Sequence, residues 1–375
     1  MTGKKLVLLT VSLAQGGAET VVMQLALALR AAGWSVSVVS MLAPTAFVDE
    51  LWAAEIPVVS LNMQPGRPNL AGLAKLVRYL RANRPDLLHS HMFHANIVAR
   101  LVQVVLGIPI VSTIHSEIEC SHRKESAGMR ELLYRFTNLV RGRTTVVSES
   151  IRDRYARLKI IPAHRVEVIG NGVDPERFRP CASQRLMTRA SLEWKDAFVW
   201  LAVGRLEIAK DYPTLIRAFQ TVHQQSPWCK LAIAGDGRMR AQLERQIRDS
   251  GLTSAVSLLG SRTDIPELMN ACDAFVMSSA WEGGPLVVLE AGATGCPVVA
   301  TEVGVATSAI VPGGTGFLVA PGLPSALAQT MLRLMSLPQD ELAAMRLEAR
   351  RRVVEHFSLP LAHRQYQRLY EEVLA

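Results

Sequence analysis

The 375-residue chain lacks a long hydrophobic run. A membrane-spanning helix needs roughly 18 or more uninterrupted apolar residues, and no stretch of the sequence reaches that length. The nearest candidate, 97–114, is interrupted by Arg100, Gln103 and Pro109. The apolar run Leu6–Val11 is too short for the apolar region of a secretory signal and is typical of a buried strand. We therefore expect neither a spanning helix nor a secretory signal.

Cysteine is also scarce, and its spacing excludes two further classes. The five cysteines are scattered, are odd in number and form no Cys-x-x-Cys pair. Zinc sites usually contain closely spaced cysteine pairs, and the disulfide frameworks of small secreted proteins contain an even number of cysteines. We expect no zinc site here, and mostly buried, reduced thiols in a cytosolic protein.

The composition is that of an ordinary globular protein, with 49% hydrophobic and 20% charged residues. Its length suggests two or three domains. The net charge of +8 is uneven, because residues 1–165 contain 20 Lys and Arg against 11 Asp and Glu, whereas residues 166–375 contain 21 against 22. The first half is therefore the basic half.

The basic character is strongest between His122 and Arg143, where six Lys or Arg stand against two Glu. Apolar residues such as Leu132 and Phe136 are interleaved with them. A basic amphipathic helix of this kind can lie on an anionic lipid surface. The alternative is a solvated helix with an apolar stripe in the core. We do not expect nucleic acid as a partner, because no base-stacking aromatic motif accompanies the charge.

Short apolar runs and helical patterns alternate along the whole chain. The first unit is a strand at 6–11, a Gly-rich loop at 12–20, a helix at 21–32 and a strand at 36–40. This order is typical of a doubly wound α/β fold. The loop does not match Gly-x-Gly-x-x-Gly, so it does not support a dinucleotide site. The pattern predicts two similar α/β halves with a cleft between them, where ligands usually bind.

Histidines follow two of the expected strands in the first half. One strand ends in the run His89-Ser90-His91-Met92-Phe93-His94, and the strand at 108–114 is followed by His115. Ligands bind at the carboxyl ends of such strands, although a structural role is the more common fate of a single histidine. No carboxylate completes the His89–His94 cluster, so we do not expect a metal there.

The second alternating set begins after 175–195, a segment rich in Pro, Arg and polar residues that is typical of a linker. Its first strand, 198–203, leads into a loop that contains Arg205 and Lys210. Two cations at the carboxyl end of a strand can clamp a diphosphate. The alternative is a pair of surface charges.

The stretch 279–293 combines a tight loop with a helix-forming run. Gly283 and Gly284 allow a ligand to approach the backbone, and Pro285 suits a first helical turn, where no N–H is needed. The N–H groups and dipole at such a helix start favour an anion. Glu282 and Glu290 bracket this loop and are better suited to binding hydroxyl groups than phosphate. The alternative is an ordinary helix start with a solvated Glu.

Taken together, these motifs resemble the family-4 retaining glycosyltransferases, which have the GT-B fold of two Rossmann-like domains facing across a cleft. The resemblance extends from Leu6 to about Phe357. The matching motifs are Gly16-Gly17-Ala18-Glu19, Asn171-Gly172-Val173-Asp174, Gly204-Arg205-Leu206 with Lys210, Glu282-Gly283-Gly284-Pro285 through Glu290, and Gly295 to Thr301. It implies an N-terminal acceptor-side domain (1–175), a nucleotide-sugar-binding domain (190–357) and a terminal helix (358–375) that packs back on the first domain.

The resemblance also implies roles for the donor-binding residues. Arg205 and Lys210 would neutralise the donor diphosphate, which the Gly16 and Gly17 backbone would contact from the facing domain. Glu290 would bind the ribose hydroxyls. The remaining donor contacts would come from Glu282 and the backbone of Gly283, Gly284, Pro285 and Leu286, which would hold the transferred sugar.

His115 would lie under that sugar, near the anomeric carbon. We accordingly name His115, Arg205, Lys210 and Glu282 as the catalytic residues. The acceptor side is assigned to His91, His94 and Ser148.

The implied reaction needs no cofactor. The donor, UDP-sugar in preference to GDP-sugar, carries its own leaving group, so positioning and charge stabilisation carry the catalysis. The sequence has no Asp-x-Asp pair, and Arg205 and Lys210 would replace a metal. The resemblance implies retention by same-face attack, with the diphosphate taking the acceptor proton. We expect the enzyme to transfer a hexose or N-acetylhexosamine to a glycan or lipid-linked acceptor. The reaction would take place on the cytoplasmic side of an anionic membrane, which the basic domain would contact.

Two segments depart from the family pattern. Gly304 is followed by Val305, and Ser308 stands where relatives have an acid, so the donor loop can differ in detail. His115 is followed by Ser116, where many relatives have Asp. Two alternatives also stay open: a nucleotide-sugar epimerase on the same fold, and a non-catalytic partner that retains the fold.

Overall fold

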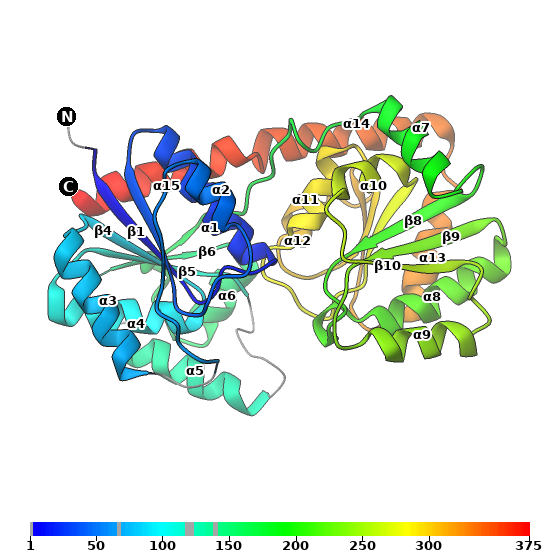
Figure 1. Ribbon diagram of the computed structural model, residues 1–375. Coiled ribbons are helices and arrows are strands. Elements are labelled where there is room, and N and C mark those ends of the chain that lie inside the picture. Colours follow the sequence, from blue (N-terminus) through cyan, green and yellow to red (C-terminus); the bar gives the residue numbers. More distant parts are fainter. Residues whose placement is uncertain (1–2, 66–68, 117–123, 138–141) are drawn as a thin grey trace. The chain divides into compact units, whose positions relative to one another are not determined.

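The computed structural model describes residues 3–65, 69–116, 124–137 and 142–375. The chain forms two compact units (Figure 1). Unit 1 comprises Met1–Asn171 and Pro360–Ala375, and unit 2 comprises Gly172–Leu359. Each is a parallel sheet with helices on both faces, as the alternation of strands and helices predicts.

The described part of unit 1 has a seven-stranded sheet in the order β3-β2-β1-β4-β5-β6-β7. The strands are β1 (Lys5–Thr10), β2 (Ser35–Ser40), β3 (Val58–Ser60), β4 (Leu87–His91), β5 (Ile110–Ile114), β6 (Arg143–Val146) and β7 (Val166–Val168). The helices are α1 (Gly17–Ala31), α2 (Val48–Ala53), α3 (Leu70–Asn83), α4 (Phe93–Leu106), α5 (Lys124–Thr137), α6 (Glu149–Arg157), the 3₁₀ turn η1 (Ala163–Arg165) and α15 (Leu359–Leu374).

Unit 2 has a six-stranded sheet in the order β10-β9-β8-β11-β12-β13. Its described strands are β8 (Phe198–Val203), β9 (Cys229–Ala234), β10 (Val256–Gly260), β11 (Ala274–Met277), β12 (Val298–Thr301) and β13 (Gly316–Val319). Its helices are α7 (Ala182–Ser191), the 3₁₀ turn η2 (Ile208–Lys210), α8 (Tyr212–Gln225), α9 (Arg240–Asp249), α10 (Ile265–Ala271), α11 (Leu286–Ala293), α12 (Ala306–Ala309), α13 (Pro324–Met335) and α14 (Gln339–His356).

Both sheets are buried on both faces, which is why their strands read as continuous apolar runs. In unit 2, one face of β8 packs Trp200 against α8 and α13, and the other face packs Leu201 against α10 and α11. In each sheet the strand order reverses once, between β1 and β4 in unit 1 and between β8 and β11 in unit 2. Open α/β sheets bind ligands beyond the carboxyl ends of the strands at such a reversal.

The terminal helix α15 belongs to unit 1 from Pro360 onward. It packs Tyr366 and Tyr370, both almost fully buried, against the sheet, and Tyr370 also makes an edge contact with Trp34 at 5.6 Å between ring centroids. Within unit 2, the outgoing and returning chains run side by side, because Val173 N–H donates to Phe357 O and Leu359 N–H donates to Val173 O.

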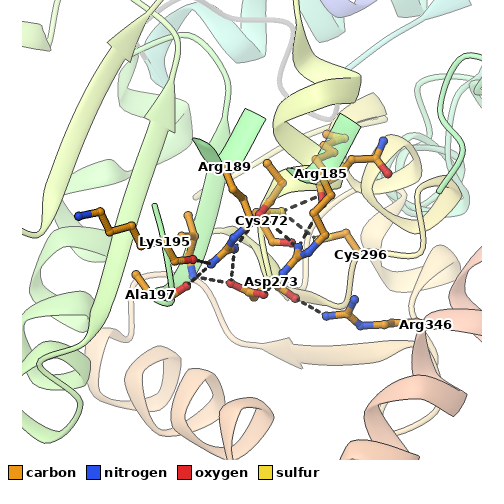
Figure 2. Close-up of polar contacts among 12 residues, drawn as sticks. Arg185, Arg189, Lys195, Ala197, Cys272, Asp273, Cys296 and Arg346 are labelled. Carbon is orange, nitrogen blue, oxygen red and sulfur yellow. Dashed lines mark hydrogen bonds and ion pairs between the residues drawn. The ribbon is translucent and has the colours of Figure 1, made fainter. Parts of the chain in front are cut away.

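The structure corrects the interpretation of 175–195 as a linker. The segment contains α7, which packs on α10 within unit 2. Arg185 and Arg189 on α7 both bond to the carboxylate of Asp273, at 2.6 and 3.0 Å (Figure 2). Their remaining N–H groups donate to backbone carbonyls such as those of Cys272 and Ala197. The sequence suggested that these arginines are solvent-exposed, because their bonding partners lie far away in the sequence.

Candidate active site

The charged residues at the carboxyl ends of β8 and β11 come together in unit 2. The 3₁₀ turn η2 after β8 carries Lys210, and the loop after β11 carries Glu282. Lys210 Nζ lies 2.7 Å from Glu282 Oε1, and both side chains are about four-fifths buried. A largely buried pair of this kind is screened less than a surface pair, so it holds both groups in place. The structure therefore joins two predicted catalytic residues directly.

Buried hydroxyl groups support this ion pair. Ser279 Oγ donates to Glu282 Oε1 at 3.0 Å, and Ser278 Oγ donates to the carbonyl of Lys210 at 2.9 Å. Thr301 Oγ1, at the end of β12, in turn donates to the carbonyl of Ser279 at 2.7 Å. The loops that follow three neighbouring strands are thus tied together, and the positions of Lys210 and Glu282 are set by the sheet.

Gly204 is required where β8 meets this loop. Its φ of +153° lies in a region that side chains rarely adopt, and a Cβ there would stand 2.8 Å from Lys210 Cε. The carbonyl of Gly204 accepts a hydrogen bond from Tyr212 Oη at 2.9 Å. Glycine at this position therefore lets the Lys210 side chain lie against the strand end.

Arg205 and Glu290 have no such protein partners. Arg205 is exposed, and neither its guanidinium group nor the carboxyl group of Glu290 makes a hydrogen bond or ion pair within the described residues. Burial raises the pKa of Glu290 to about 7, although Arg177 and Lys210 oppose the rise. The unpaired Arg205 guanidinium in the loop after β8, and the unpaired Glu290 carboxyl group near Lys210, leave hydrogen-bonding capacity for a polar ligand.

The loop between Glu282 and Glu290 differs slightly from the sequence prediction. Helix α11 begins at Leu286, and Pro285 is the residue before it, with an extended ψ of 102°. Its helix start carries no side-chain cap, so the first N–H groups are available. Gly283 and Gly284 precede it, and Val305 N–H donates to the carbonyl of Gly283 at 3.1 Å.

The two departures at 305 and 308 serve packing within the described structure. Val305 is buried, and Gly304, at φ +55°, lies so close to Gly283 that a Cβ would stand 2.5 Å from its carbonyl oxygen. Ser308 Oγ donates to the carbonyl of Val305, and Arg352 Nη2 donates to the carbonyl of Ser308. This segment therefore braces the Gly283 loop by its backbone.

In unit 1, the loop after β1 carries Gly16 and Gly17 at the start of α1. Gly16 is the residue before the helix, and a Cβ there would stand 2.5 Å from the Glu19 carboxylate. Glu19 Oε1 accepts a hydrogen bond from Ser12 Oγ at 2.7 Å. Gly17 is exposed, so its backbone is accessible to a ligand. The family resemblance implies that this ligand is the donor diphosphate.

The histidines lie together at the ends of β4 and β5. His91 Nδ1 is 3.0 Å from His115 Nε2, and the centroids of the His89 and His91 rings lie 4.0 Å apart with the rings tilted by 40°. His89 is bonded at both ring nitrogens, to Tyr370 Oη and Thr113 Oγ1. Burial lowers the pKa of His115 to about 4 and lowers those of His89 and His91 well below their ordinary value. The three rings are therefore neutral at pH 7.

The three residues assigned to the acceptor side differ in their exposure. His94 has an exposed side chain in the first turn of α4, where burial of part of the ring and Arg130 lower its pKa. His91 is fully buried, and Ser148 is almost fully buried with its hydroxyl bonded to that of Ser150. Direct contact between an acceptor and His91 or Ser148 is not available in this geometry, whereas contact with His94 is.

Comparison with known proteins decides the family. Residues 15–177 match the model described as Glycosyltransferase Family 4, and residues 184–352 match the model described as Glycosyl transferases group 1. A D-inositol 3-phosphate glycosyltransferase from Salinispora arenicola is 30% identical over 315 residues, which cover 77% of this chain and 69% of the relative. The chain belongs to glycosyltransferase family 4.

Other relatives agree with this family and with the GT-B fold. An Escherichia coli UDP-Gal:alpha-D-GlcNAc-diphosphoundecaprenol alpha-1,3-galactosyltransferase is 28% identical over 264 residues, which cover 68% of this chain and 67% of the relative. The crystal structure of Anabaena HepE in complex with UDP-glucose superposes with a TM-score of 0.87 at 26% identity, covering 98% of this chain and 99% of that one. This chain has the two Rossmann-like domains of the GT-B fold, as expected from the alternating pattern and the family resemblance.

Three residues of this family-4 site were not singled out from the sequence. Ser278 and Ser279 orient the ion pair, and Arg177 lies close enough to Glu290 to affect its pKa. A serine before a loop belongs to no recognisable sequence motif, so nothing in the sequence identified Ser278 and Ser279. Arg177 could have been identified by its position just after the Asn171–Asp174 motif.

Proposed function

We propose that this family-4 enzyme transfers a hexose or N-acetylhexosamine, with retention and without a metal, from a UDP-sugar to a lipid-linked glycan acceptor. The observation that carries the proposal is the Lys210–Glu282 pair, with the Glu290 carboxyl group near Lys210 and Arg205 in the same loop after β8. Neither the Arg205 guanidinium nor the Glu290 carboxyl group has a hydrogen-bonding partner among the described residues. Cations suit a diphosphate, and carboxylates suit the hydroxyls of the sugar and the ribose. The UDP-glucose complex of HepE supports the donor class.

Donor binding would break the Lys210–Glu282 pair. The diphosphate carries more negative charge than one carboxylate, so Lys210 would exchange Glu282 for a phosphate oxygen, which Arg205 would also bind. Glu282, still held by Ser279, would then accept hydrogen bonds from the sugar hydroxyls. The ion pair thus keeps both side chains oriented in the free enzyme, and the donor separates them.

The transfer step follows from this charge arrangement. The bond between the anomeric carbon and the phosphate oxygen breaks as Lys210 and Arg205 stabilise the developing negative charge. The acceptor oxygen attacks the same face, and its proton passes to the departing phosphate oxygen. Unit 1 would supply His115 and the Gly17 backbone to the reaction. The two fixed cations take the part that a divalent ion plays in other transferases.

A lipid-linked acceptor is supported by one relative and by one surface. The Escherichia coli galactosyltransferase is named for a diphosphoundecaprenol-linked acceptor. In unit 1, helices α4 and α5 pack together and leave large apolar side chains exposed. We call this the α4–α5 apolar surface: Leu101, Val104, Val105, Met129, Leu132, Leu133 and Phe136. Exposed apolar clusters of this kind mark interaction sites.

The charge beside this surface supports an anionic membrane as its partner. Arg135 is exposed on α5, and the first 165 residues carry an excess of nine positive charges. Of the basic segment identified in the sequence, Arg123 and Arg141 lie outside the described residues. No helix in the described part of the chain is long and apolar enough to cross a bilayer. We therefore propose attachment to the cytoplasmic membrane face through the α4–α5 apolar surface.

The donor assignment is tested by incubating the purified enzyme with UDP-, GDP- and ADP-sugars, in EDTA, with and without a polyprenyl-diphosphate sugar. Transfer from a UDP-sugar that needs the acceptor supports the proposal. Conversion of the donor to an epimer without acceptor would indicate the epimerase alternative. Binding of a donor with no turnover under any condition would indicate a non-catalytic partner.

Flotation with lipid vesicles tests the membrane proposal. Met129→Ser combined with Phe136→Ser should reduce binding to anionic vesicles at least about threefold, because each exposed apolar side chain contributes to insertion. Leu186→Ser, at another exposed leucine on α7, is the matched control. Equal binding by all three proteins would exclude the α4–α5 apolar surface as the attachment site.

A further inference from the structure

The hydrogen bond between His91 and His115 links a buried ring to one that is only partly buried. His91 is fully buried on β4, and its Nδ1 lies 3.0 Å from His115 Nε2. Both rings are neutral, because burial lowers their pKa values far below 7. A hydrogen bond between two neutral imidazoles needs one N–H donor and one bare nitrogen. The proton therefore belongs to either His91 Nδ1 or His115 Nε2.

The other nitrogen of His91 decides between these two arrangements. His91 Nε2 is buried and has no hydrogen-bonding partner within the described residues. The neighbouring His89 ring cannot serve it, because both of its nitrogens are bonded to hydroxyl groups. If His115 donated, His91 would carry its proton on Nε2 and bury an unpaired N–H. If His91 donates, only a lone pair at Nε2 is left without a partner.

Buried N–H groups without an acceptor are rarer in proteins than acceptors without a donor. Leaving such a donor unpaired costs about 1–3 kcal/mol. His91 should therefore carry its proton on Nδ1 and donate it to His115 Nε2. His115, with Nε2 accepting, must then carry its own proton on Nδ1.

We propose that His91 is a positioning residue that holds His115 as its Nδ1–H tautomer, so that His115 offers an N–H donor to the substrate. The proposal rests on the proposed function for the role of His115 itself. Nδ1 of His115 makes no hydrogen bond to the described residues. In this tautomer Nδ1 can donate to an oxygen of the transferred sugar and cannot act as a general base. This agrees with a reaction in which the departing diphosphate takes the acceptor proton.

The support behind His91 is rigid. The His89 ring packs against it at a tilt of 40° and is bonded to Tyr370 Oη at 2.5 Å and to Thr113 Oγ1 at 2.7 Å. Thr113 Oγ1 also lies 2.5 Å from Thr145 Oγ1 on β6. Since these groups come from β4, β5, β6 and α15, the His91 ring has little freedom to rotate and exchange its nitrogens.

Imidazole NMR tests the tautomer without any substrate. In a long-range ¹H–¹⁵N correlation spectrum at pH 7, His115 should show a protonated Nδ1 and an unprotonated Nε2, and His91 should show the same pattern. His115→Gln and His91→Asn assign the signals by their loss. A protonated Nε2 on either ring would overturn the proposal, whatever reaction the enzyme catalyses.

Kinetics provide the second measurement. His91→Leu removes the donor and should lower kcat about 10- to 100-fold, the usual cost of losing a residue that orients a catalytic group, with the donor KM changed less than about threefold. His91→Asn keeps an N–H near the position of Nδ1 and should restore most of the rate. His164→Leu, at an exposed histidine in η1, is the control.

The two variants distinguish failure of this proposal from failure of the proposed function. If the wild-type enzyme transfers sugar but His91→Asn is as slow as His91→Leu, the donor role of His91 is excluded. If the wild-type enzyme transfers no sugar at all, the proposed function is wrong, but the NMR result on the tautomers of His91 and His115 still stands. If His91→Leu does not fold, the wild-type spectrum alone decides.

Discussion

At the amino end of the sheet in unit 2, Asp273 accepts hydrogen bonds from Arg185, Arg189 and the Val199 N–H (Figure 2). These contacts lie at the amino ends of β8 and β11. Beyond the carboxyl ends of the same two strands, the Arg205 guanidinium and the Glu290 carboxyl group have no hydrogen-bonding partner among the described residues. Both ends contain the same residue types, arginines and acids.

The difference lies in how completely the charges are satisfied. The arginines at the amino end also donate to the carbonyls of Cys272, Lys195 and Ala197, so little hydrogen-bonding capacity remains for a ligand. Arg346 adds a donor to the carbonyl of Asp273. Buried charges that are fully paired stabilise a fold, whereas half-buried charges left unpaired indicate a binding site. Substitutions at the two ends should therefore separate stability from activity.

The largest effect is expected for Lys210→Gln. It removes one of two cations that stabilise the leaving diphosphate, and loss of one such contact costs about 10³-fold in kcat/KM, or about 4 kcal/mol. The free energy of unfolding should also fall, by about 1–3 kcal/mol, because Glu282 loses its ion-pair partner. Steady-state kinetics and denaturant unfolding measure the two quantities, with Lys195→Gln at an exposed lysine as the control. Unchanged kcat/KM would contradict the role of Lys210.

Asp273→Ala, at the amino end, should lower stability without weakening UDP binding. It leaves Arg185 and Arg189 without their carboxylate, and breaking a largely buried ion pair costs about 3 kcal/mol of stability. Urea unfolding measures this loss, while the affinity of the folded fraction for UDP should stay within about twofold. A large loss of UDP affinity without loss of stability would show that the two ends are not independent.

Glu290→Gln should have a pH-dependent effect. The folded state raises the pKa of Glu290 from about 4.5 to about 7, so the charged form destabilises the fold as pH rises through this interval. The variant lacks this cost, so its free energy of unfolding should match that of wild type at pH 4 and exceed it by about 3 kcal/mol at pH 8. Urea unfolding at both pH values measures the difference.

The same substitution should weaken UDP binding about tenfold at pH 8, because an amide accepts hydrogen bonds from the ribose less strongly than a carboxylate. UDP affinity of the wild type should rise with pH through 7, and that of the variant should not. A variant that is less stable than wild type at pH 8 would contradict the assigned pKa.

The smallest effect is expected for Ser279→Ala. It removes the hydroxyl that orients Glu282 in the free enzyme, and one neutral-to-charged hydrogen bond contributes about 1–2 kcal/mol. We expect kcat/KM to fall about tenfold, mainly through kcat. Thr330→Ala, which removes a hydroxyl bonded only within α13, is the control. An unchanged rate would show that Glu282 is oriented by Lys210 alone.

The alternation of strands and helices was enough to predict both sheets, because buried parallel strands and amphipathic helices have different apolar periods. The placement of Arg205, Lys210 and Glu282 in loops at strand ends, and of Glu290 on the helix that follows, also came from that pattern. The pairing of Lys210 with Glu282 could not be predicted, since the two residues are far apart in the sequence and no local pattern links them.

Side-chain direction and distant partners account for the rest. The sequence placed His91 at the end of a strand, but only the packing of His89 and α15 shows that its ring is buried behind the surface. The segment 175–195 was interpreted as a linker because Arg185 and Arg189 look like solvated charges until Asp273 is found beside them. Local patterns identify strand ends, whereas long-range contacts decide which charges are satisfied there.

Calorimetric titration of UDP in the presence of EDTA tests most directly whether the carboxyl end of the unit 2 sheet binds a diphosphate without a metal. Wild-type protein should bind UDP with a micromolar Kd. Arg205→Gln should weaken binding about 30-fold, or about 2 kcal/mol, whereas Arg351→Gln, at an exposed arginine paired with Glu348, should bind as wild type does. Failure of the wild type to bind UDP in EDTA, or equal affinity of Arg205→Gln and wild type, would contradict the assignment.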